Sequence, residues 1–257
     1  MNKIFNKSAL SELKSEKYLF ELPFPHIVIE NLFNDDFLKK VLKSVLECNK
    51  ESWWKYNNVF EKKFAFNNYQ KMPVELKRYF DSVNSNYFVK KLEELTDIKD
   101  IISDPSLYGG GIHKIKKGGK LDIHEDFNFH KITGWKRKLN MITYLNLDWK
   151  EEYKGSTEFW NKNMTHCVKS IAPFYNRTVI FSVDSDSFHG HPDPLECPEN
   201  VSRYSLATYY YTFNKKENLN LSYKSTRYKK RPGDKTDSSI EEMRVLRSQG
   251  RLKNETE

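Results

Sequence analysis

Strand-forming residues and a His-x-Asp pair occur together in Leu121-Asp122-Ile123-His124-Glu125-Asp126, and a further histidine, His189, follows 65 residues after His124. In an extended strand alternate side chains point to one face, so His124 and Asp126 are predicted to lie side by side. Two imidazoles and one carboxylate, supplied by two distant strands, are the ligand set of a facial iron(II) site with open coordination positions. The segment therefore predicts a strand whose face can hold a metal.

The open coordination positions favour an iron site that catalyses oxidation over a metal site that only stabilises the fold. A structural metal site closes its ligand shell, whereas oxygen activation requires free positions. The alternative is that His124 and Asp126 form an exposed strand pair and that His189 lies in a loop, because His-x-Asp alone has low specificity.

The sequence after His189 adds a cation to this pattern. Prolines and turn residues interrupt the chain over 190–200, and β-branched and aromatic residues over 201–212 then predict a long strand. A guanidinium binds a carboxylate through two parallel hydrogen bonds and keeps its charge, so an inward-facing Arg203 suits the distal end of a dicarboxylic acid. The alternative is an arginine on the surface of the strand. Four residues of the strand would share the face of this arginine: Arg203, Ser205, Ala207 and Tyr209.

Four elements in this order resemble the iron(II)- and 2-oxoglutarate-dependent oxygenases, specifically the prolyl hydroxylase-like branch. They are the His-x-Asp pair, a strand that ends in Tyr-Leu-Asn and a tryptophan within Lys138-Leu139-Asn140-Met141-Ile142-Thr143-Tyr144-Leu145-Asn146-Leu147-Asp148-Trp149, a distal histidine, and Arg-x-Ser in Arg203-Tyr204-Ser205. The similarity runs from Pro23 to Asp234, which is most of the chain.

The resemblance implies a ligand set and a cofactor. His124, Asp126 and His189 would bind Fe(II), with no catalytic residue beyond these ligands. A second group would hold 2-oxoglutarate, with O2 as co-substrate: Arg203, Tyr144 and Ser205.

Two departures from the family pattern stand out. Relatives often have Gly-Gly where this chain has Gly155-Ser156, and one glycine still permits the turn. His189 and His191 would share a strand face, so either could be the distal ligand, although His189 matches the family position better. Asp126 stands where halogenating relatives have a small residue, which favours hydroxylation.

The family reaction couples decarboxylation of 2-oxoglutarate to succinate and CO2 with hydroxylation of an unactivated C–H bond. The resemblance points to a proline-like residue in a peptide, or to a free amino acid, as the substrate. A desaturation, cyclisation or epimerisation of a small metabolite is the alternative outcome at the same site. A non-enzymatic jelly-roll binding module is a third possibility, which the intact ligand set disfavours.

Periodicity predicts helices in the first part of the chain and strands in the rest. Helices are expected after Asn34, after Pro73 and over 86–95. Short strands separated by turn residues predict two packed antiparallel sheets, and the resemblance refines this fold to a double-stranded β-helix, the cupin-like jelly roll, with flanking helices, an α+β arrangement. The expected strands are 27–30, 112–115, 121–126, 139–147, 158–160, 167–171, 178–183 and 202–212.

We expect one oxygenase domain over 1–257, because a chain of this length can build one large core. It would comprise a helical N-terminal support over about 1–105, the jelly-roll core over about 106–213 and a basic C-terminal extension over about 214–257. In the extension, Ser238 with Glu241 and Ser239 with Glu242 predict capping boxes of a terminal helix that stops near Gly250 and docks on its own domain.

Composition narrows the expected partners and compartment. The three cysteines have no paired spacing, and no apolar segment is long enough to cross a bilayer, so we expect a cytoplasmic protein without membrane contact. Most of the net charge of +8 lies in the C-terminal extension, which contains twelve Lys and Arg residues and seven Asp and Glu residues. The basic run over 224–231 lacks interleaved aromatic residues suited to base stacking and any known reader motif, so nucleic acid is a less favoured partner than a small-molecule or peptidyl substrate. A monomer or a homodimer is expected.

Other polar residues near the motif receive weaker predictions. His130 and Trp135 fall in an expected loop after the first ligands and are candidates for substrate binding, because loops often carry function. Glu125, between the ligands, is expected to face away toward the surface. His113 is expected in the core, although it could line the pocket.

Overall fold

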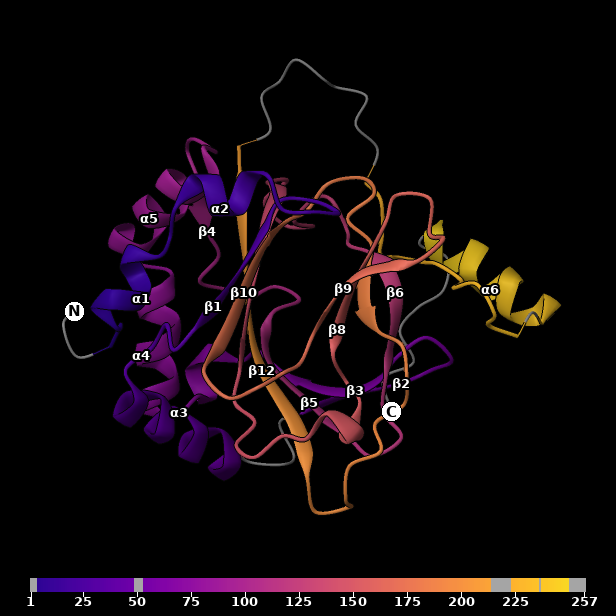
Figure 1. Ribbon diagram of the computed structural model, residues 1–257, viewed down its shortest axis with the longest axis horizontal. Helices are drawn as coiled ribbons and strands as arrows, with labels where there is room; N and C mark the ends of the chain where they lie inside the picture. The colour runs from indigo at the N-terminus through magenta and orange to yellow at the C-terminus, as the bar shows by residue number, and fades with distance from the viewer. Residues whose placement is uncertain (1–3, 49–52, 214–222, 236, 250–257) are drawn as a thin grey trace.

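The computed structural model describes residues 4–48, 53–213, 223–235 and 237–249. Two antiparallel sheets face each other, and helices cover the outer side of the larger one (Figure 1). This is the predicted jelly-roll architecture. The helices, including two short 3-10 turns, are α1 (Lys7–Ser11), α2 (Ser15–Leu19), α3 (Asp35–Glu47), η2 (Tyr69–Lys71), α4 (Val74–Val83), α5 (Asn86–Thr96), η3 (Glu151–Tyr153) and α6 (Ser238–Ser248).

The larger sheet has the order β1-β10-β7-β12-β5-β3-β2, with β4 pairing β12, and the smaller sheet has the order β13-β6-β11-β8-β9. Every pairing between these strands is antiparallel. The strands are β1 (His26–Glu30), β2 (Trp54–Asn57), β3 (Lys62–Phe66), β4 (Ile102–Ser103), β5 (Gly111–Lys116), β6 (Leu121–Glu125), β7 (Lys136–Tyr144), β8 (Thr157–Trp160), β9 (Cys167–Ile171), β10 (Arg177–Ser182), β11 (His189–His191), β12 (Ser202–Thr212) and β13 (Arg227–Tyr228).

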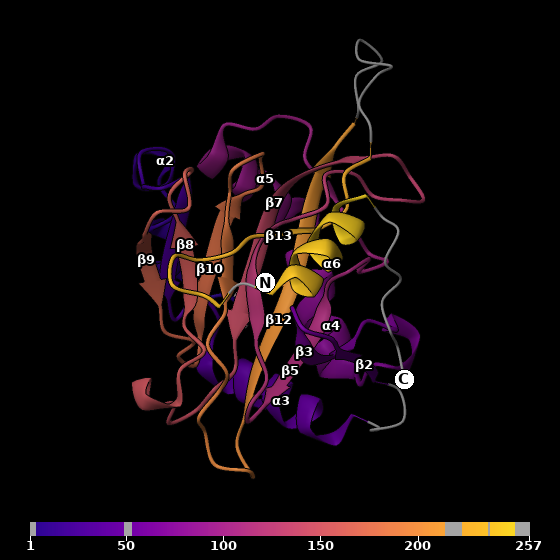
Figure 2. The same ribbon diagram turned by 90° about the vertical axis from the view of Figure 1, so that its right-hand side faces the viewer.

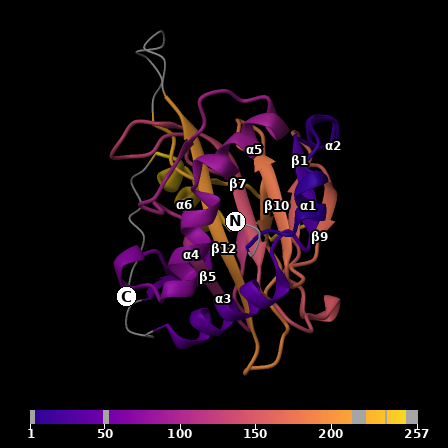
Figure 3. The same cartoon turned by 90° about the vertical axis from the view of Figure 1, so that its left-hand side faces the viewer.

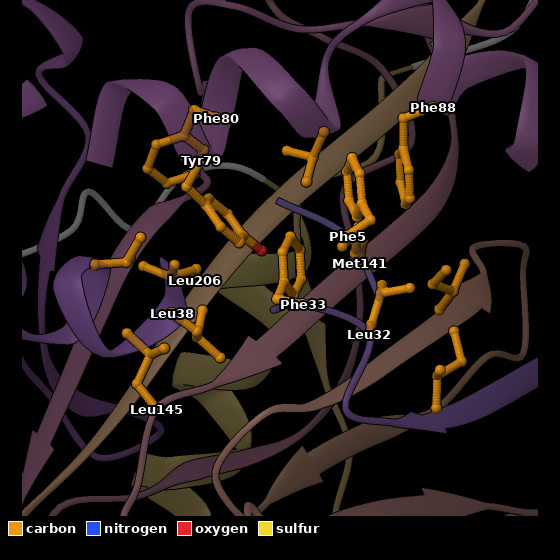
Figure 4. Close-up of a cluster of buried hydrophobic side chains, with 14 of the residues drawn as sticks. Phe5, Leu32, Phe33, Leu38, Tyr79, Phe80, Phe88, Met141, Leu145 and Leu206 are labelled. Carbon is orange, nitrogen blue, oxygen red and sulfur yellow. The ribbon is translucent and has the colours of Figure 1, made fainter. Parts of the chain in front are cut away.

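The main hydrophobic core lies between the helices and the larger sheet (Figures 3 and 4). Helix α3 begins where predicted, because the Asn34 side chain accepts a hydrogen bond from the Phe37 amide at 3.1 Å. From the sheet, Met141 of β7 and Leu206 of β12 enter this core. A smaller apolar cluster around Phe159 and Phe181 fills part of the space between the sheets.

Strand β12 shows the alternation that the sequence predicts. Leu206 and Tyr210 point into the helix-side core, whereas Arg203, Ser205 and Tyr209 border a cavity between the sheets. Burial of one face therefore fixes the register, and it fixes which residues reach the cavity.

Two regions differ from expectation. The N-terminal part is not only helical, since β2 and β3 form a hairpin that extends the larger sheet at its edge. In the C-terminal part, β13 joins the smaller sheet by pairing with β6. Charged residues within these short segments obscure the alternation by which a strand is identified.

The capping boxes predicted for the terminal helix are wrong. Asp237 is the N-cap of α6, and its carboxylate accepts a hydrogen bond from the Ser239 amide at 2.8 Å. Ser238 already belongs to the helix. The predicted stop at Gly250 lies outside the described residues. Helix α6 packs against β13, as expected for docking on its own domain (Figure 2).

Over the ranges described, no helix has the length and apolar character needed to span a membrane.

Candidate functional site

His124, Asp126 and His189 lie together between the sheets. One ligand atom from each residue is within 4.8 Å of the other two. Strands β6 and β11 are antiparallel neighbours, and His189 lies directly opposite His124. Strand pairing therefore brings residues that are far apart in the sequence into one cluster. His191 is not part of the cluster.

Gly190 allows the two ligand-bearing strands to approach. A Cβ atom at this position would lie 2.7 Å from the carbonyl oxygen of Asp122 and 2.8 Å from that of Leu121. Glycine has no Cβ, so only glycine fits here without moving backbone.

Backbone carbonyls orient both imidazoles. Nδ1 of His124 lies 2.8 Å from the carbonyl oxygen of Asp122, and Nδ1 of His189 lies 2.9 Å from that of Ser187. Since a carbonyl only accepts, each Nδ1 carries the proton and each Nε2 keeps its lone pair. The Nε2 atoms of His124 and His189 lie 3.5 Å and 3.4 Å from the carboxylate of Asp126. Three possible ligand atoms thus lie close enough to share one divalent cation.

Burial also supports a neutral His189, because it lowers the pKa of this imidazole to about 4. Burial alone would raise the pKa of Asp126, but the neighbouring Arg137 guanidinium brings it well below its ordinary value. The cluster therefore offers two neutral nitrogen donors and one carboxylate, which fits Fe(II).

Two residues of β7 hold the Asp126 carboxylate in place. Its Oδ2 atom accepts a hydrogen bond from the Asn140 side chain at 2.8 Å and lies 3.1 Å from the Arg137 guanidinium. The guanidinium also donates to the Asn140 amide oxygen at 2.6 and 2.9 Å. It is stacked between the rings of Phe127 and Tyr209, with its central carbon 4.4 and 3.4 Å from their centroids.

Sequence reasoning missed Arg137 and Asn140 for a geometric reason. Three positions separate them, so strict alternation places them on opposite faces of a strand. An irregularity in the pairing with β12 leaves Lys138 as an extra residue between Arg137 and Leu139. Such a bulge turns both side chains toward Asp126.

At the other end of the cavity, Arg203 is 3% exposed. Its Nε donates to the Gly155 carbonyl at 2.8 Å, and a terminal nitrogen donates to the Thr157 hydroxyl at 3.1 Å. The ring of Tyr144 lies 5.0 Å from the guanidinium carbon. Burial lowers the pKa of Arg203, and within the described part of the chain no carboxylate lies within ion-pair distance of it. A buried cation without a counter-charge is costly, so the site is suited to an anion.

Gly155 is needed beside this arginine. A Cβ atom there would lie 2.5 Å from the Leu195 side chain and 3.2 Å from Cδ of Arg203, and φ is +77°. Gly155, the one glycine where relatives often have Gly-Gly, therefore provides both the turn and the close contact.

The metal cluster and Arg203 open into the same cavity of about 1300 Å³. Arg203 and Ser205 border it, whereas Tyr144 supports Arg203 from behind, with its hydroxyl 2.7 Å from that of Thr157. Other parts of the wall come from the β2–β3 hairpin and the C-terminal segment: Trp54, Tyr56, Glu61, Lys63, Ala65, Tyr223, Ser225, Thr226, Tyr228, Arg247 and Gln249.

The two loop residues expected to contact substrate are placed differently. His130 borders the cavity, and its Nδ1 accepts hydrogen bonds from the amides of Ile132 and Thr133, each at 3.3 Å. Trp135 packs near His130 and Tyr211 and is not among the described residues that border the cavity. His130 therefore also shapes its loop.

Two predictions for neighbouring residues are wrong. Glu125 does face away from the metal cluster, but it is 4% exposed because β13 covers it, and its carboxylate pairs with Arg227. His113 borders the cavity instead of filling the core, and burial lowers its pKa to about 3. Its place opposite Ser205 on β12 could have been inferred only from the strand pairing.

Comparisons with known proteins agree with this geometry. A family model described as the 2OG-Fe(II) oxygenase superfamily matches residues 110–211. Mouse prolyl 3-hydroxylase OGFOD1 is 24% identical over 194 residues, which are 74% of this chain and 33% of the relative. The chain thus spans about a third of the length of the curated relative that it matches.

Solved structures share the fold at low sequence identity. A prolyl hydroxylase from Trichoplax adhaerens, in complex with a peptide fragment of a hypoxia-inducible factor, gives a TM-score of 0.57 at 16% identity, covering 82% of this chain and 96% of that one. HygX from Streptomyces hygroscopicus, with nickel, 2-oxoglutarate and hygromycin B bound, gives 0.51 at 9% identity, covering 80% and 87%.

Proposed function

We propose that this chain is a member of the 2OG-Fe(II) oxygenase superfamily, whose model matches residues 110–211, and that it hydroxylates an unactivated C–H bond of a peptidyl proline. One observation carries the proposal: three metal-binding side chains and a buried arginine without a counter-charge border one cavity. We further propose that the described residues form a single oxygenase domain, because strands from the N-terminal part and from the C-terminal extension complete its two sheets.

In this proposal His124, Asp126 and His189 hold the iron. The two Nε2 lone pairs and the Asp126 carboxylate supply the ligands, and Asn140 and Arg137 keep that carboxylate in position. With only these three protein ligands, a bound ion would keep further coordination positions for other groups.

The other end of the cavity would hold 2-oxoglutarate. Arg203 would bind its distal carboxylate, Ser205 would border it, and Tyr144 would stabilise the guanidinium through its ring. When bound, iron and 2-oxoglutarate supply the oxidising chemistry, in which O2 is consumed and 2-oxoglutarate is converted to succinate and CO2. The chain's own residues orient the reactants and exclude water.

A peptidyl substrate is supported by the size and walls of the cavity. Its volume of about 1300 Å³ exceeds the roughly 300–1,000 Å³ of typical small-molecule sites. Aromatic side chains, including Trp54, Tyr56 and Tyr108, border it, and aromatic-lined grooves suit extended proline-containing peptides. The mouse relative is named a prolyl 3-hydroxylase, and the Trichoplax enzyme was solved with a peptide.

A small metabolite is the second candidate substrate, with hydroxylation or another oxidative outcome. The structural similarity to HygX, which was solved with hygromycin B, favours it. A free amino acid belongs to the same class of small substrate.

The basic C-terminal residues are better explained by internal pairing than by nucleic acid. Arg227 pairs with Glu125, and Arg231 lies 2.9 Å from Asp193 and 3.2 Å from Asp234. Cations neutralised in this way contribute little to binding phosphates. We propose that this segment serves as a wall of the cavity.

The proposal is tested by incubating Fe(II)-loaded protein with 2-oxoglutarate, O2 and a panel of proline-containing peptides, free amino acids and sugar-linked metabolites. Succinate release and product mass are followed together. A peptide product heavier by one oxygen atom supports prolyl hydroxylation. A metabolite product, or a product that has lost two hydrogens or kept its mass, supports the second candidate. His189→Ala is the test variant. His166→Ala is its matched control, because His166 is an exposed histidine outside the cluster. Equal activity of the two variants would reject the proposed site.

A further inference from the structure

The wall of the cavity carries more positive charge than the reaction outlined above uses. Five lysine and arginine side chains border it, whereas Glu61 and Asp126 are the only carboxylates there among the residues that the structure describes. Arg137 neutralises Asp126, and Arg203 is assigned to the distal carboxylate of 2-oxoglutarate. Iron(II) and 2-oxoglutarate bring equal and opposite charges, so loading the site does not cancel the excess. The charged groups that remain are Lys63, Lys131, Arg247 and Glu61.

Glu61 is shared by two of these cations. Its carboxylate lies 3.0 Å from the Lys63 ammonium and 3.5 Å from the Arg247 guanidinium, and its side chain is 4% exposed. Burial alone would lower the pKa of Lys63, but the neighbouring Glu61 carboxylate raises it above its ordinary value, so the ammonium stays charged. One carboxylate between two cations leaves a net positive charge in a wall that water screens poorly. Such a wall attracts anions.

The Lys63 ammonium is accessible to a ligand. Its side chain borders the cavity and is 14% exposed, with the ammonium 5.0 Å from the centroid of the Tyr56 ring. An ammonium has three donors, and over the described ranges Glu61 is the only carboxylate within ion-pair distance of it. Lys63 can therefore bind a second carboxylate.

Lys63 lies in a different part of the cavity from Arg203. In the larger sheet β5 separates β3 from β12, and neighbouring strands are about 4.8 Å apart, so the strands that carry the two cations are about 10 Å apart. Through Glu61, Lys63 is linked to Arg247 of helix α6. Lys63 thus belongs to the wall formed by the β2–β3 hairpin and the C-terminal segment, which also contains aromatic residues assigned above to a peptide.

We propose that the substrate is a peptide in which an acidic residue flanks the target proline, and that the Lys63 ammonium binds the carboxylate of this residue. The proposal rests on the proposed function, because it names the class of peptide that the site accepts. Lys131 strengthens the preference for an anion, since its ammonium lies 5.2 Å from the Tyr223 ring and both residues border the cavity. Lys63 is then a specificity-determining residue.

The test compares peptides that differ in a single charge. Peptides with one proline carry glutamate, glutamine or lysine at single positions on either side of it. The kcat/KM of Fe(II)-loaded protein is measured for each peptide at low and at high salt, and product mass confirms hydroxylation.

Matched variants assign the preference to one side chain. Lys63→Met removes the charge and keeps an unbranched apolar stem, and Glu61 retains Arg247 as a partner. Lys63→Arg keeps the charge. Lys116→Met makes the same substitution at an exposed lysine of the neighbouring strand β5, which is not among the described residues that border the cavity.

The expected result is a preference that depends on Lys63. At one position, or at adjacent positions, glutamate raises kcat/KM by about ten-fold or more over glutamine, because the hydrogen bond gains a charged acceptor. Lysine at that position lowers kcat/KM, and high salt reduces the advantage of glutamate. The ratio of glutamate to glutamine falls close to one in Lys63→Met and is retained in Lys63→Arg and Lys116→Met.

Other results would overturn the inference. Hydroxylation of glutamate and glutamine peptides with equal kcat/KM at every position would do so, while the proposed function stands. A preference for glutamate that survives in Lys63→Met would show that another group recognises the charge. If Lys63→Met does not fold, the salt dependence of wild-type protein decides, because an advantage that salt does not reduce is not electrostatic. Absence of hydroxylation of every peptide would reject the proposed function together with this inference.

Discussion

The two ends of the cavity balance their charges in different ways. At the metal end, the Asp126 carboxylate has a cation, an amide donor and two imidazoles around it, even without an ion. At the other end, Arg203 is buried too, but its partners in the described structure are a carbonyl, a hydroxyl and an aromatic ring. The first end is organised by the protein alone, whereas the second lacks a counter-charge among the described residues. Under the proposed function, the metal site would be formed before the co-substrate binds at Arg203.

The largest effect is expected from removing the carboxylate at the metal end. Asp126→Ala takes away one of three ligands and leaves Arg137 buried without its counter-charge, so bound iron and activity should fall to background. Metal content by elemental analysis and succinate release measure both. Asp122→Asn is the control, because this aspartate lies on strand β6, which ends just before Asp126, but pairs with Lys120. Retained iron in Asp126→Ala would contradict the assignment of the ligands.

The two buried arginines should respond oppositely to neutralisation. Arg137→Met leaves the Asp126 carboxylate without its cation and should lower the unfolding free energy of metal-free protein by about 3–5 kcal/mol. Arg203→Met removes an uncompensated charge and should leave that free energy unchanged or higher. Urea unfolding measures both.

The substitutions Arg203→Met and Arg137→Met also distinguish an effect on 2-oxoglutarate binding from an effect on folding stability. Arg203→Met should weaken 2-oxoglutarate binding by about 100-fold or more, because two charge-assisted hydrogen bonds are lost. Mn(II) affinity should be unchanged. A stability loss in Arg203→Met as large as that in Arg137→Met would remove the distinction between the two ends.

The ligand itself should stabilise the protein through the uncompensated end. At a free concentration of 100 times its Kd, 2-oxoglutarate should add about 2.7 kcal/mol to the stability of metal-loaded protein. Differential scanning fluorimetry with and without the diacid detects this as a higher Tm. Chelation of the metal should reduce the gain, since the metal-chelating contacts are then lost. No shift in Tm at saturating concentrations would argue against binding at Arg203.

The smallest effect concerns the strand that covers the metal end from outside. Glu125→Gln removes the charge that pairs with Arg227, and we expect a stability loss of about 1 kcal/mol, because the arginine remains partly exposed. Thermal unfolding gives the value, with Glu158→Gln of strand β8 as the comparison. A change in metal affinity beyond three-fold would show that β13 also tunes the ligands.

Local periodicity predicted much of this molecule. The strands that carry His124 and Arg203, the cap at Asn34 and the face shared by Arg203, Ser205 and Tyr209 follow from alternation and turn chemistry. The metal cluster was predicted from four elements in their order along the chain, because His-x-Asp alone has low specificity.

The features that the sequence did not predict depend on pairing between strands that are far apart in the chain. Arg137 reaches Asp126 only through a bulge, which has no signature in the sequence. Glu125 is buried because a segment about 100 residues later covers it. His113 reaches the cavity because of its place opposite Ser205. Such features depend on which strands become neighbours, and composition within one segment does not record that.

The C-terminal wall has a practical consequence for handling the protein. The family match ends at residue 211, so this position could be mistaken for the end of the domain when a shorter version is designed. Truncation at this residue would remove the part of the cavity wall that contains Tyr223, Tyr228 and Arg247. It would also remove β13, which covers Glu125 on the strand that bears His124. A shortened version that expresses well could therefore bind iron loosely and be mistaken for an inactive relative.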